Sequence, residues 1–409
     1  MAAADIRNPT ATAHGIANFA PLPEAERSGI GLCLSGGGYR AALFHLGVLR
    51  RFNELGILPQ VTTISSVSGG SIISAFLATK IAWPLSAPVA DWERSISAPF
   101  RNFTSTNIRT GALLKSLLPW VRAVSALAST YESSLTQLKL GDIPPKPTFI
   151  LCATDLGFGV NWTFERSRMG DYQGGYVAPT PPTWPLGLAV AASSCFPPVF
   201  NPLPIRLKPS QFTPGKFPLG SKRDRILSTM RLSDGGVYDN LGLEPVWRSH
   251  KVVLSSDGGA LFDPAAERNI FRWVKGYVAI PENQALALRK RWLISNFLNG
   301  TLTGTYCGIG SLATNYGNPA ATGYGNNIVE NCIAKIRTDL DRFSDAESRI
   351  LENHGYCLAD AAARRHIPNL ISSGALPFAL PHPSWMNEDA ARKALENSWR
   401  RTLVGRGWL

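Results

Sequence analysis

The chain contains a small-residue turn, SVSGG, with Ser68 at its centre. The turn follows a strand-like run at residues 61–65 and leads into an apolar segment with helical spacing at residues 71–80. It is close to the pattern G-x-S-x-G, in which a sharp strand-to-helix turn projects a serine hydroxyl from the edge of a sheet. Ser66 stands where that pattern has glycine and is small enough to be tolerated. We therefore expect Ser68 to be a nucleophile, with the N–H of Gly69 facing the reacting carbonyl oxygen.

A glycine-rich turn of similar character lies about 30 residues upstream. Gly36, Gly37 and Gly38 stand between an apolar run at residues 29–35 and a segment with helical spacing at residues 39–55. Glycines let the backbone approach a ligand closely, and the N–H groups at a helix start favour negative charge. That charge is either a phosphate or a transient oxyanion. The sequence lacks the G-K-[ST] that would follow in a nucleotide-binding P-loop, which argues against a nucleotide.

A serine hydroxyl needs a neighbouring base before it becomes a good nucleophile. None of the six histidines stands in a small-residue turn after a strand, and His45 lies on the apolar face of a helix, as a structural residue would. Asp234 and Asp257 do stand in small-residue turns, since each belongs to an Asp-Gly-Gly turn after a strand-like run. We favour Asp234 as the base, because Asn240 and Pro245 indicate a rigid loop behind it, whereas Asp257 closes a plain hydrophobic strand.

These turns require a particular arrangement of strands and helices. Strand, turn and helix occur twice in the first 80 residues, which is typical of a βαβ unit with a parallel sheet. Further strands are predicted at residues 148–156 and 161–166, and the pattern from about residue 262 onward is mostly helical. The two turns would then lie side by side at the carboxyl ends of adjacent parallel strands, where open α/β sheets form their sites.

Composition limits the classes of protein that remain. The chain has 409 residues, of which 44% are apolar and 17% charged, as in an ordinary globular protein. No apolar run reaches the roughly 18 residues of a membrane span, and the first residues resemble no secretory leader. The six cysteines are far apart and form no C-x-x-C, so we expect a cytoplasmic protein with no metal or other cofactor.

Lys and Arg exceed Asp and Glu by 41 − 29 = 12, which favours contact with anionic surfaces. The basic residues are scattered, so no nucleic acid partner is expected. Residues 111–129 and 285–300 each mix Leu, Trp or Phe with Lys and Arg, as helices at a membrane surface do. The alternative for both is a core helix with a solvated basic edge.

Taken together, the motifs resemble the patatin-like phospholipase family of serine–aspartate acyl hydrolases. The segments that carry this resemblance occur in the family's order between residues 29 and 246: SGGGYRAALFHLGVL, SSVSGGS, AVAASSCFPPVFNP and LSDGGVYDNLGLEPVW. Residues 337–356, RTDLDRFSDAESRILENHGY, are also similar to the C-terminal part of bacterial members.

The resemblance implies a three-layer α/β/α fold with a mainly parallel central sheet, a helical C-terminal part and a Ser–Asp dyad without a third member. Ser68 would be the nucleophile and Asp234 the base. Arg40 matches the arginine that closes the family's glycine motif, and it either contacts a lipid head group or pairs with a carboxylate at the helix start. Ser66 departs from the family's glycine. The residues expected to line the oxyanion hole are Gly36, Gly37, Gly38 and Gly69.

The expected organisation is a lead-in at residues 1–27, a patatin-like catalytic domain at 28–260 and a mainly helical extension at 261–409 packed on it. The expected function is a phospholipase A- or lysophospholipase-like esterase that acts on lipid esters and contacts the membrane peripherally. One alternative is an α/β-hydrolase with a Ser–Asp–His triad, although its elbow usually follows several strands. Another is a lipid-binding or regulatory protein without turnover on the same fold.

Overall fold

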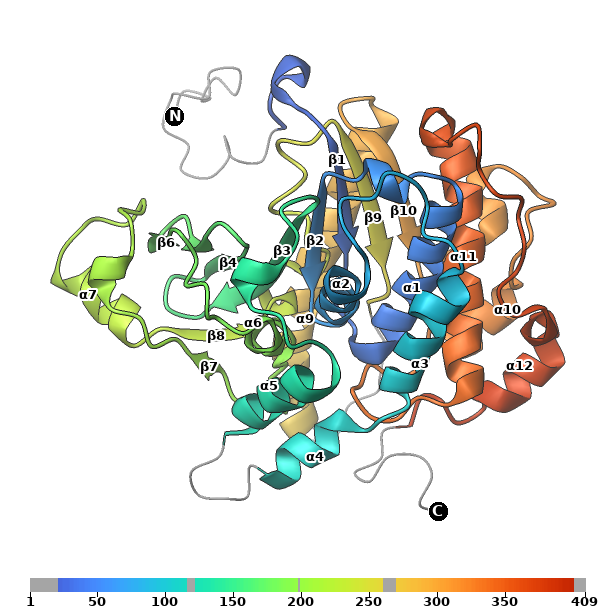
Figure 1. Ribbon diagram of the computed structural model, residues 1–409. Coiled ribbons are helices and arrows are strands. Elements are labelled where there is room, and N and C mark those ends of the chain that lie inside the picture. The colour runs from blue at the N-terminus through green and yellow to red at the C-terminus, as the bar shows by residue number, and fades with distance from the viewer. Residues whose placement is uncertain (1–20, 116–121, 198, 260–269, 401–409) are drawn as a thin grey trace, which may run out of the picture.

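The computed structural model describes residues 21–115, 122–197, 199–259 and 270–400 (Figure 1). One sheet runs through the molecule in the order β10-β9-β1-β2-β3-β4-β5-β6, with β8 also paired to β3 and β7 to β8. The strands are β1 Ile30–Leu34, β2 Thr63–Val67, β3 Thr148–Asp155, β4 Val160–Phe164, β5 Met169–Asp171, β6 Gly175–Val177, β7 Leu203–Pro204, β8 Arg231–Asp234, β9 Val252–Asp257 and β10 Thr303–Gly308.

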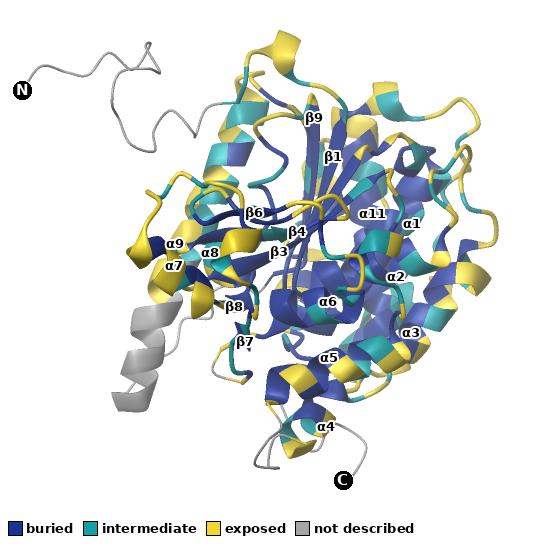
Figure 2. Ribbon diagram, turned by 60° about the vertical axis from the view of Figure 1, so that its left-hand side comes forward, coloured by how far each residue is buried: buried dark blue, intermediate teal, exposed yellow. Residues whose placement is uncertain are grey.

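Helices cover both faces of this sheet, which gives three layers (Figures 1 and 2). The α-helices are α1 Gly38–Glu54, α2 Gly69–Lys80, α3 Ala98–Thr104, α4 Ile108–Lys115, α5 Ala123–Ser134, α6 Leu186–Ser194, α7 Ser221–Ser228, α8 Gly236–Asp239, α9 Ile270–Leu298, α10 Asn326–Ile328, α11 Asp345–His366 and α12 Glu388–Leu395. The fold is therefore the expected three-layer α/β/α arrangement, in which α1, α2 and α11 form one layer and α9 lies across the other face.

The central strands are apolar along their whole length because both of their faces are covered. In β1, Leu32 and Leu34 belong to the core beneath α1 and α11, whereas Cys33 belongs to a second cluster with Leu293 of α9. Neighbouring side chains of a strand point to opposite faces, so a strand between two layers of helices needs a continuous apolar run. This is the reason that residues 29–35 show no alternation of polar and apolar residues.

The centre of the sheet is parallel and its flank is antiparallel. Strands β10, β9, β1, β2 and β3 all run in one direction. On the other side, the strands predicted at residues 148–156 and 161–166 are present as β3 and β4 and pair antiparallel, and β4 to β6 continue antiparallel. The helical extension predicted at residues 261–409 contributes to the sheet itself, because β10 forms the edge strand of the sheet. Its helix α11 packs along α1.

Close backbone contact joins α1 to α11. A Cβ atom at Gly47 would lie 1.9 Å from the carbonyl oxygen of Glu352, and one at Gly355 would lie 2.1 Å from that of Phe44. Side chains at these two positions would separate the helices, so glycine lets them cross at short range. The start of α11 is also well defined, because Ser344 and Glu347 form a reciprocal capping box.

Two strands share one edge of β3. Residues 151–155 of β3 pair with β4 on one side. On the other side, β2 ends where Val67 lies opposite Cys152, and β8 ends where Asp234 lies opposite Ala153. Because β2 is parallel and β8 antiparallel to β3, their carboxyl ends meet head-on at adjacent residues of β3. The turns that follow Val67 and Asp234 are therefore brought together by strand register alone.

Two buried carboxyl groups lie together on the antiparallel flank. Asp155 and Asp171 are 0% and 1% exposed. One oxygen of Asp155 accepts the N–H of Gly157 at 2.6 Å, and one oxygen of Asp171 accepts that of Gly174 at 2.6 Å. Burial, together with the neighbouring carboxylate of Asp155, raises the pKa of Asp171 to about 7. Asp171 therefore binds a proton at a higher pH than an exposed aspartate does.

We expect this pair to make unfolding pH-dependent. Because the pKa of Asp171 is raised on folding, the stabilisation from its bound proton is complete at acidic pH and is lost as the pH rises toward 7. Asp171→Asn keeps an acceptor oxygen and removes the carboxyl group that titrates. The unfolding free energy of the wild type should therefore fall relative to the variant by up to about 1.4 kcal/mol per pH unit between pH 5 and about 7.

Urea denaturation of both proteins across this pH range measures the difference. Asp224→Asn, at an exposed carboxylate, serves as the control and should follow the wild type. Identical pH dependence in the wild type and Asp171→Asn would contradict the raised pKa of Asp171.

Candidate active site

Ser68 occupies a strained turn between β2 and α2. Its backbone has φ +49° and ψ −113°, and Asp91 is the other non-glycine residue with positive φ in the described chain. Residues with a Cβ atom avoid this region, and such strain of about 1–3 kcal/mol persists only where the surrounding structure enforces it. Ser68 is 8% exposed. This is the elbow geometry that the small-residue pattern predicted.

The serine turn and the glycine turn are in direct backbone contact, which confirms that they lie side by side. The N–H of Gly70 donates to the carbonyl of Ser35 at 3.0 Å. A Cβ atom at Gly69 would lie 2.1 Å from the carbonyl oxygen of Gly38. Any side chain at position 69 would therefore push the two turns apart.

The glycines at the N-termini of α1 and α2 differ in how their N–H groups are bonded. In the described chain, no acceptor is recorded for the N–H groups of Gly37, Gly38 and Gly69. The N–H of Gly36 differs, because it donates to the carbonyl of Asn240 at 2.9 Å. The N–H of Gly36 is therefore already bonded within the protein, and a role of Gly36, Gly37, Gly38 and Gly69 in an oxyanion hole stays a prediction.

A distant segment supports the glycine turn. The carbonyl of Asp339 accepts the N–H of Tyr39 at 2.9 Å, and it would lie 2.5 Å from a Cβ atom at Gly38. The carboxylate of Asp339 forms an ion pair with Arg109 of α4. This contact gives the family-like segment at residues 337–356 a structural role beside the site, which its residue types alone did not reveal.

Arg40 is held beside the glycine turn by hydrogen bonds to backbone carbonyls. Its side chain is 2% exposed and donates to the carbonyl of Gly258 at 3.0 and 3.2 Å and to that of Ile336 at 2.7 Å. The Gly258 oxygen in turn would lie 2.8 Å from a Cβ atom at Gly37. These contacts favour a structural role at the helix start. Contact between Arg40 and a lipid head group stays a prediction.

Asp234 and Ser68 border the same small space with the side chain of Asn240. A Cβ atom placed on Gly36 would lie 2.3 Å from the amide oxygen of Asn240 and 3.2 Å from the Cβ of Ser68. A Cβ atom placed on Gly236 would lie 2.7 Å from the same Asn240 oxygen and 3.0 Å from a carboxylate oxygen of Asp234. Asp234 is 2% exposed. Asn240, read from the sequence only as part of a rigid loop, therefore lies between the two turns.

Backbone and side-chain donors orient Asp234. One carboxylate oxygen accepts the N–H of Gly236 at 2.7 Å, and the main-chain carbonyl accepts the hydroxyl of Thr154 at 2.8 Å. The carboxylate is thus held at the end of β8 in one orientation. Such an orientation suits a residue that receives a proton from a fixed neighbour.

The second Asp-Gly-Gly turn has a different environment. Asp257 is paired with Lys290 at 2.5 Å and accepts the hydroxyl of Tyr306 at 2.6 Å. Burial acts to raise the pKa of Asp257, but the charge and hydrogen bond of Lys290 outweigh it and hold that pKa below its usual value. A carboxylate paired in this way is a poor proton acceptor, and the choice of Asp234 as the base stays a prediction.

The described histidines have partners elsewhere. His45 lies behind the glycine turn, where its Nε2 donates to the carbonyl of Ser35 at 3.0 Å and its Nδ1 accepts from the hydroxyl of Ser256 at 2.7 Å. Burial lowers the pKa of His45 to about 4, so the ring is neutral at physiological pH. Among their hydrogen bonds, His250 contacts Thr63, His354 contacts the carbonyl of Ile309, and His382 contacts Glu352. No described histidine is therefore recorded in the position that a Ser–Asp–His triad requires.

One group of three side chains in the described chain has the spacing of a metal site: Glu93, Glu352 and His382. A cation already neutralises it, because Arg101 lies 2.5 Å from Glu352 and also pairs with Glu93. Burial acts to raise the pKa of Glu352, but the hydrogen bond from His382 and the charge of Arg101 lower it to about 2. The group acts as an ion-pair network between α3 and α11.

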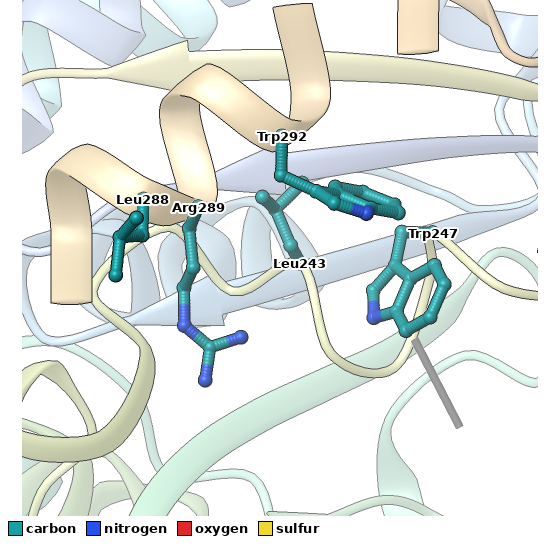
Figure 3. Close-up of a pocket in the computed structure, with 5 residues that line it drawn as sticks. All are labelled: Leu243, Trp247, Leu288, Arg289 and Trp292. Atoms are coloured by element: carbon teal, nitrogen blue, oxygen red, sulfur yellow. The ribbon is translucent and has the colours of Figure 1, made fainter. Parts of the chain in front are cut away.

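An apolar pocket of about 240 Å³ lies between α9 and the segment after α8 (Figure 3). It is lined by Leu243, Trp247, Leu288, Arg289 and Trp292. Arg289 pairs with Glu244 at 3.2 Å and Asp239 at 3.7 Å. The basic side chains of Arg289 and Lys290 therefore face acidic partners within the protein.

The predicted lipid-contacting stretches remain predictions. In residues 285–300, Leu288 and Leu298 are exposed, but the inward ion pairs favour a helix packed on the sheet. In residues 111–129, the described parts belong to α4 and α5, and residues 116–121 lie outside the described residues. Within the described chain, no helix has both the length and the apolar character needed to cross a bilayer.

Comparison with known sequences links this geometry to one family. Residues 32–247 match the family described as patatin-like phospholipase. The chain is 25% identical over 280 residues to a patatin-like phospholipase domain-containing protein of Pyricularia oryzae, covering 64% of this chain and 32% of that protein. It is 26% identical over 279 residues to one of Aspergillus niger, covering 64% and 34%. The matched region thus spans about a third of the length of these relatives.

Similar solved structures include human GIVD cytosolic phospholipase A2, with 16% identity, a TM-score of 0.38 and coverage of 58% of this chain and 46% of that chain. Another is VipD from Legionella pneumophila, with 14% identity, a TM-score of 0.33 and coverage of 91% and 75%.

The strain at Ser68 should be measurable. Because a Cβ atom is unfavourable at φ +49°, we expect Ser68→Gly to be more stable than Ser68→Ala by about 1–2 kcal/mol in urea denaturation. Ala361 in the regular helix α11 serves as the control, where glycine should be less stable than alanine by about 1 kcal/mol. The same order of glycine and alanine at both positions would show that the elbow is relaxed.

Proposed function

The chain belongs to the patatin-like phospholipase family, and on that basis we propose that it is a lipid acyl hydrolase that cleaves carboxylic esters through an acyl-Ser68 intermediate. The observation that carries the proposal is the positive φ of Ser68, at a strand-to-helix turn that directly contacts the glycine turn. Strain of this kind is concentrated at functional sites, where it presents a nucleophile clear of the sheet.

In the first step, Asp234 accepts the proton of Ser68 as Oγ attacks the ester carbonyl carbon. The carbonyl oxygen becomes an oxyanion, which the N–H groups of Gly37, Gly38 and Gly69 stabilise. One such donor typically lowers the barrier by about 3–4 kcal/mol. The tetrahedral intermediate then collapses, and protonated Asp234 returns its proton to the leaving alcohol oxygen.

The second step repeats the chemistry with water. Asp234 accepts a proton from the water that attacks the acyl carbon, and the same glycine N–H groups meet the new oxyanion. The intermediate collapses to a free carboxylic acid, and the proton goes back to Ser68 Oγ. A single carboxylate thus serves both half-reactions in turn.

The proposed substrates are esters of membrane lipids, as for a phospholipase A or lysophospholipase. The family supports a lipid ester, and the net charge of +12 favours an anionic phospholipid over a neutral glyceride. Peripheral contact with the membrane surface would deliver such a substrate.

Replacement of the dyad tests this mechanism. We expect Ser68→Ala and Asp234→Asn each to reduce hydrolysis of a p-nitrophenyl ester and of a mixed lipid extract by at least about 1,000-fold, because both remove a group of one catalytic unit. Mass spectrometry of the released products identifies the acyl position and head group. A fluorophosphonate probe should label the wild type and not Ser68→Ala.

Asp257→Asn is the matched control, since Asp257 also follows a strand in an Asp-Gly-Gly turn. It should retain activity within about tenfold. Full activity of Ser68→Ala would refute the nucleophile, and equal losses in both aspartate variants would remove the preference for Asp234. Probe labelling without turnover of any lipid would instead favour a binding or regulatory protein.

Binding to vesicles tests the role of charge. We expect more protein to sediment with vesicles that contain phosphatidylglycerol than with pure phosphatidylcholine, and the difference should shrink as salt screens the basic surface. Equal sedimentation with both vesicles would remove the preference for anionic lipid.

A further inference from the structure

Ser193 near the C-terminal end of α6 contacts the backbone of the nucleophile. Its Oγ accepts the N–H of Ser68 at 2.9 Å and donates to the carbonyl of Cys152 on β3 at 2.6 Å. Ser193 is completely buried. The N–H of a residue with φ +49° is turned away from regular secondary structure, and here a side-chain hydroxyl satisfies it.

The main chain of Ser193 reaches the other half of the dyad. Its carbonyl accepts the N–H of Gly235, the residue after Asp234, at 3.2 Å. Ser193 therefore forms hydrogen bonds to the turn of Ser68, to the turn of Asp234 and to strand β3, with which β2 and β8 both pair. No other residue of the described chain is recorded with all three contacts.

Two further serines connect to Ser193 beneath the turn. The hydroxyl of Ser71 lies 2.8 Å from that of Ser193 and 3.1 Å from that of Ser66. Ser66 donates its proton to the carbonyl of Ile150 at 3.2 Å, as Ser193 does to Cys152, so the single hydroxyl proton of Ser71 can go to either of them. Ser66, which replaces the glycine of the elbow pattern, is thus part of a hydrogen-bonded network that supports the turn.

We propose that Ser193 is a positioning residue that holds the Ser68 elbow and the Asp234 turn in reactive register. This inference rests on the proposed function, since it concerns the same dyad. Without the hydroxyl, the Ser68 N–H loses its partner and the strained backbone can relax, which moves Oγ relative to the carboxylate and the glycine donors. Small displacements of a reacting group have large effects on rate and little effect on substrate binding.

The test compares Ser193→Ala with Ser194→Ala. Ser194 is the next residue of α6, is also buried, and bonds to the carbonyl of Val190 at 2.7 Å and to the hydroxyl of Tyr131 at 3.1 Å. Both variants delete a buried hydroxyl, but only Ser193→Ala removes a contact to Ser68. Thermal unfolding reports the loss of stability, and kcat and KM for a p-nitrophenyl ester report catalysis.

For Ser193→Ala we expect kcat to fall about 10- to 100-fold and KM to change by less than about threefold. The rate of fluorophosphonate labelling should fall in parallel, while the pH midpoint of kcat/KM stays the same because the carboxylate is untouched. Ser194→Ala should lose similar stability and keep kcat within about threefold. Ser193→Cys, with a similar shape and a weaker acceptor, should have an intermediate kcat.

Wild-type kcat in Ser193→Ala, or a loss no larger than that of Ser194→Ala, would overturn the proposal. If Ser193→Ala does not fold, wild-type kcat in Ser193→Cys would overturn it. A wild type that neither labels nor hydrolyses any ester would instead refute the proposed function, and this inference with it.

Discussion

The site depends on two strands that meet head-on along one edge of β3. Because β4 occupies the opposite edge, β2 and β8 must share the remaining one, and they approach from opposite directions. Val67 ends opposite Cys152 and Asp234 ends opposite the next residue of β3. A shift of either strand by one residue would turn its side chains to the other face, so burial on both faces holds this register. The strand that leads to Ser68 and the strand that ends in Asp234 therefore stop at adjacent residues of β3.

Around this meeting point, main-chain groups form many of the hydrogen bonds that hold the turns in place. The helices α1 and α2 begin next to each other, and glycine lets the two turns touch at a distance that no side chain would allow. Support comes from remote parts of the chain: the carbonyl of Asn240 holds Gly36, that of Gly258 holds Arg40, and that of Asp339 holds Tyr39. Such reinforcement is what allows a strained residue to persist at Ser68.

Two identical Asp-Gly-Gly turns illustrate how environment decides a residue's chemistry. The sequence around Asp257 resembles that around Asp234, and both carboxylates are 2% exposed. Lys290 of α9 and Tyr306 of β10 reach Asp257 and hold it as a paired anion, which fixes the far layer of helices to the sheet. Asp234 instead lies beside Asn240 and the elbow. The difference arises from elements about 30 to 50 residues downstream of Asp257, which no local pattern contains.

The sequence by itself determined the elements that carry the site: the strand–turn–helix pairs around Ser68 and the glycine turn, the parallel sheet, and the preference for Asp234. These follow from local rules, because apolar periodicity and small residues act over a few neighbouring positions. Only the tertiary structure decided that β10 completes the sheet, that the N–H of Gly36 is already bonded, that Arg40 is buried among carbonyls, and that Ser193 joins both turns. Hydrogen bonds between residues more than a hundred positions apart depend on how the layers pack, and that information is not local.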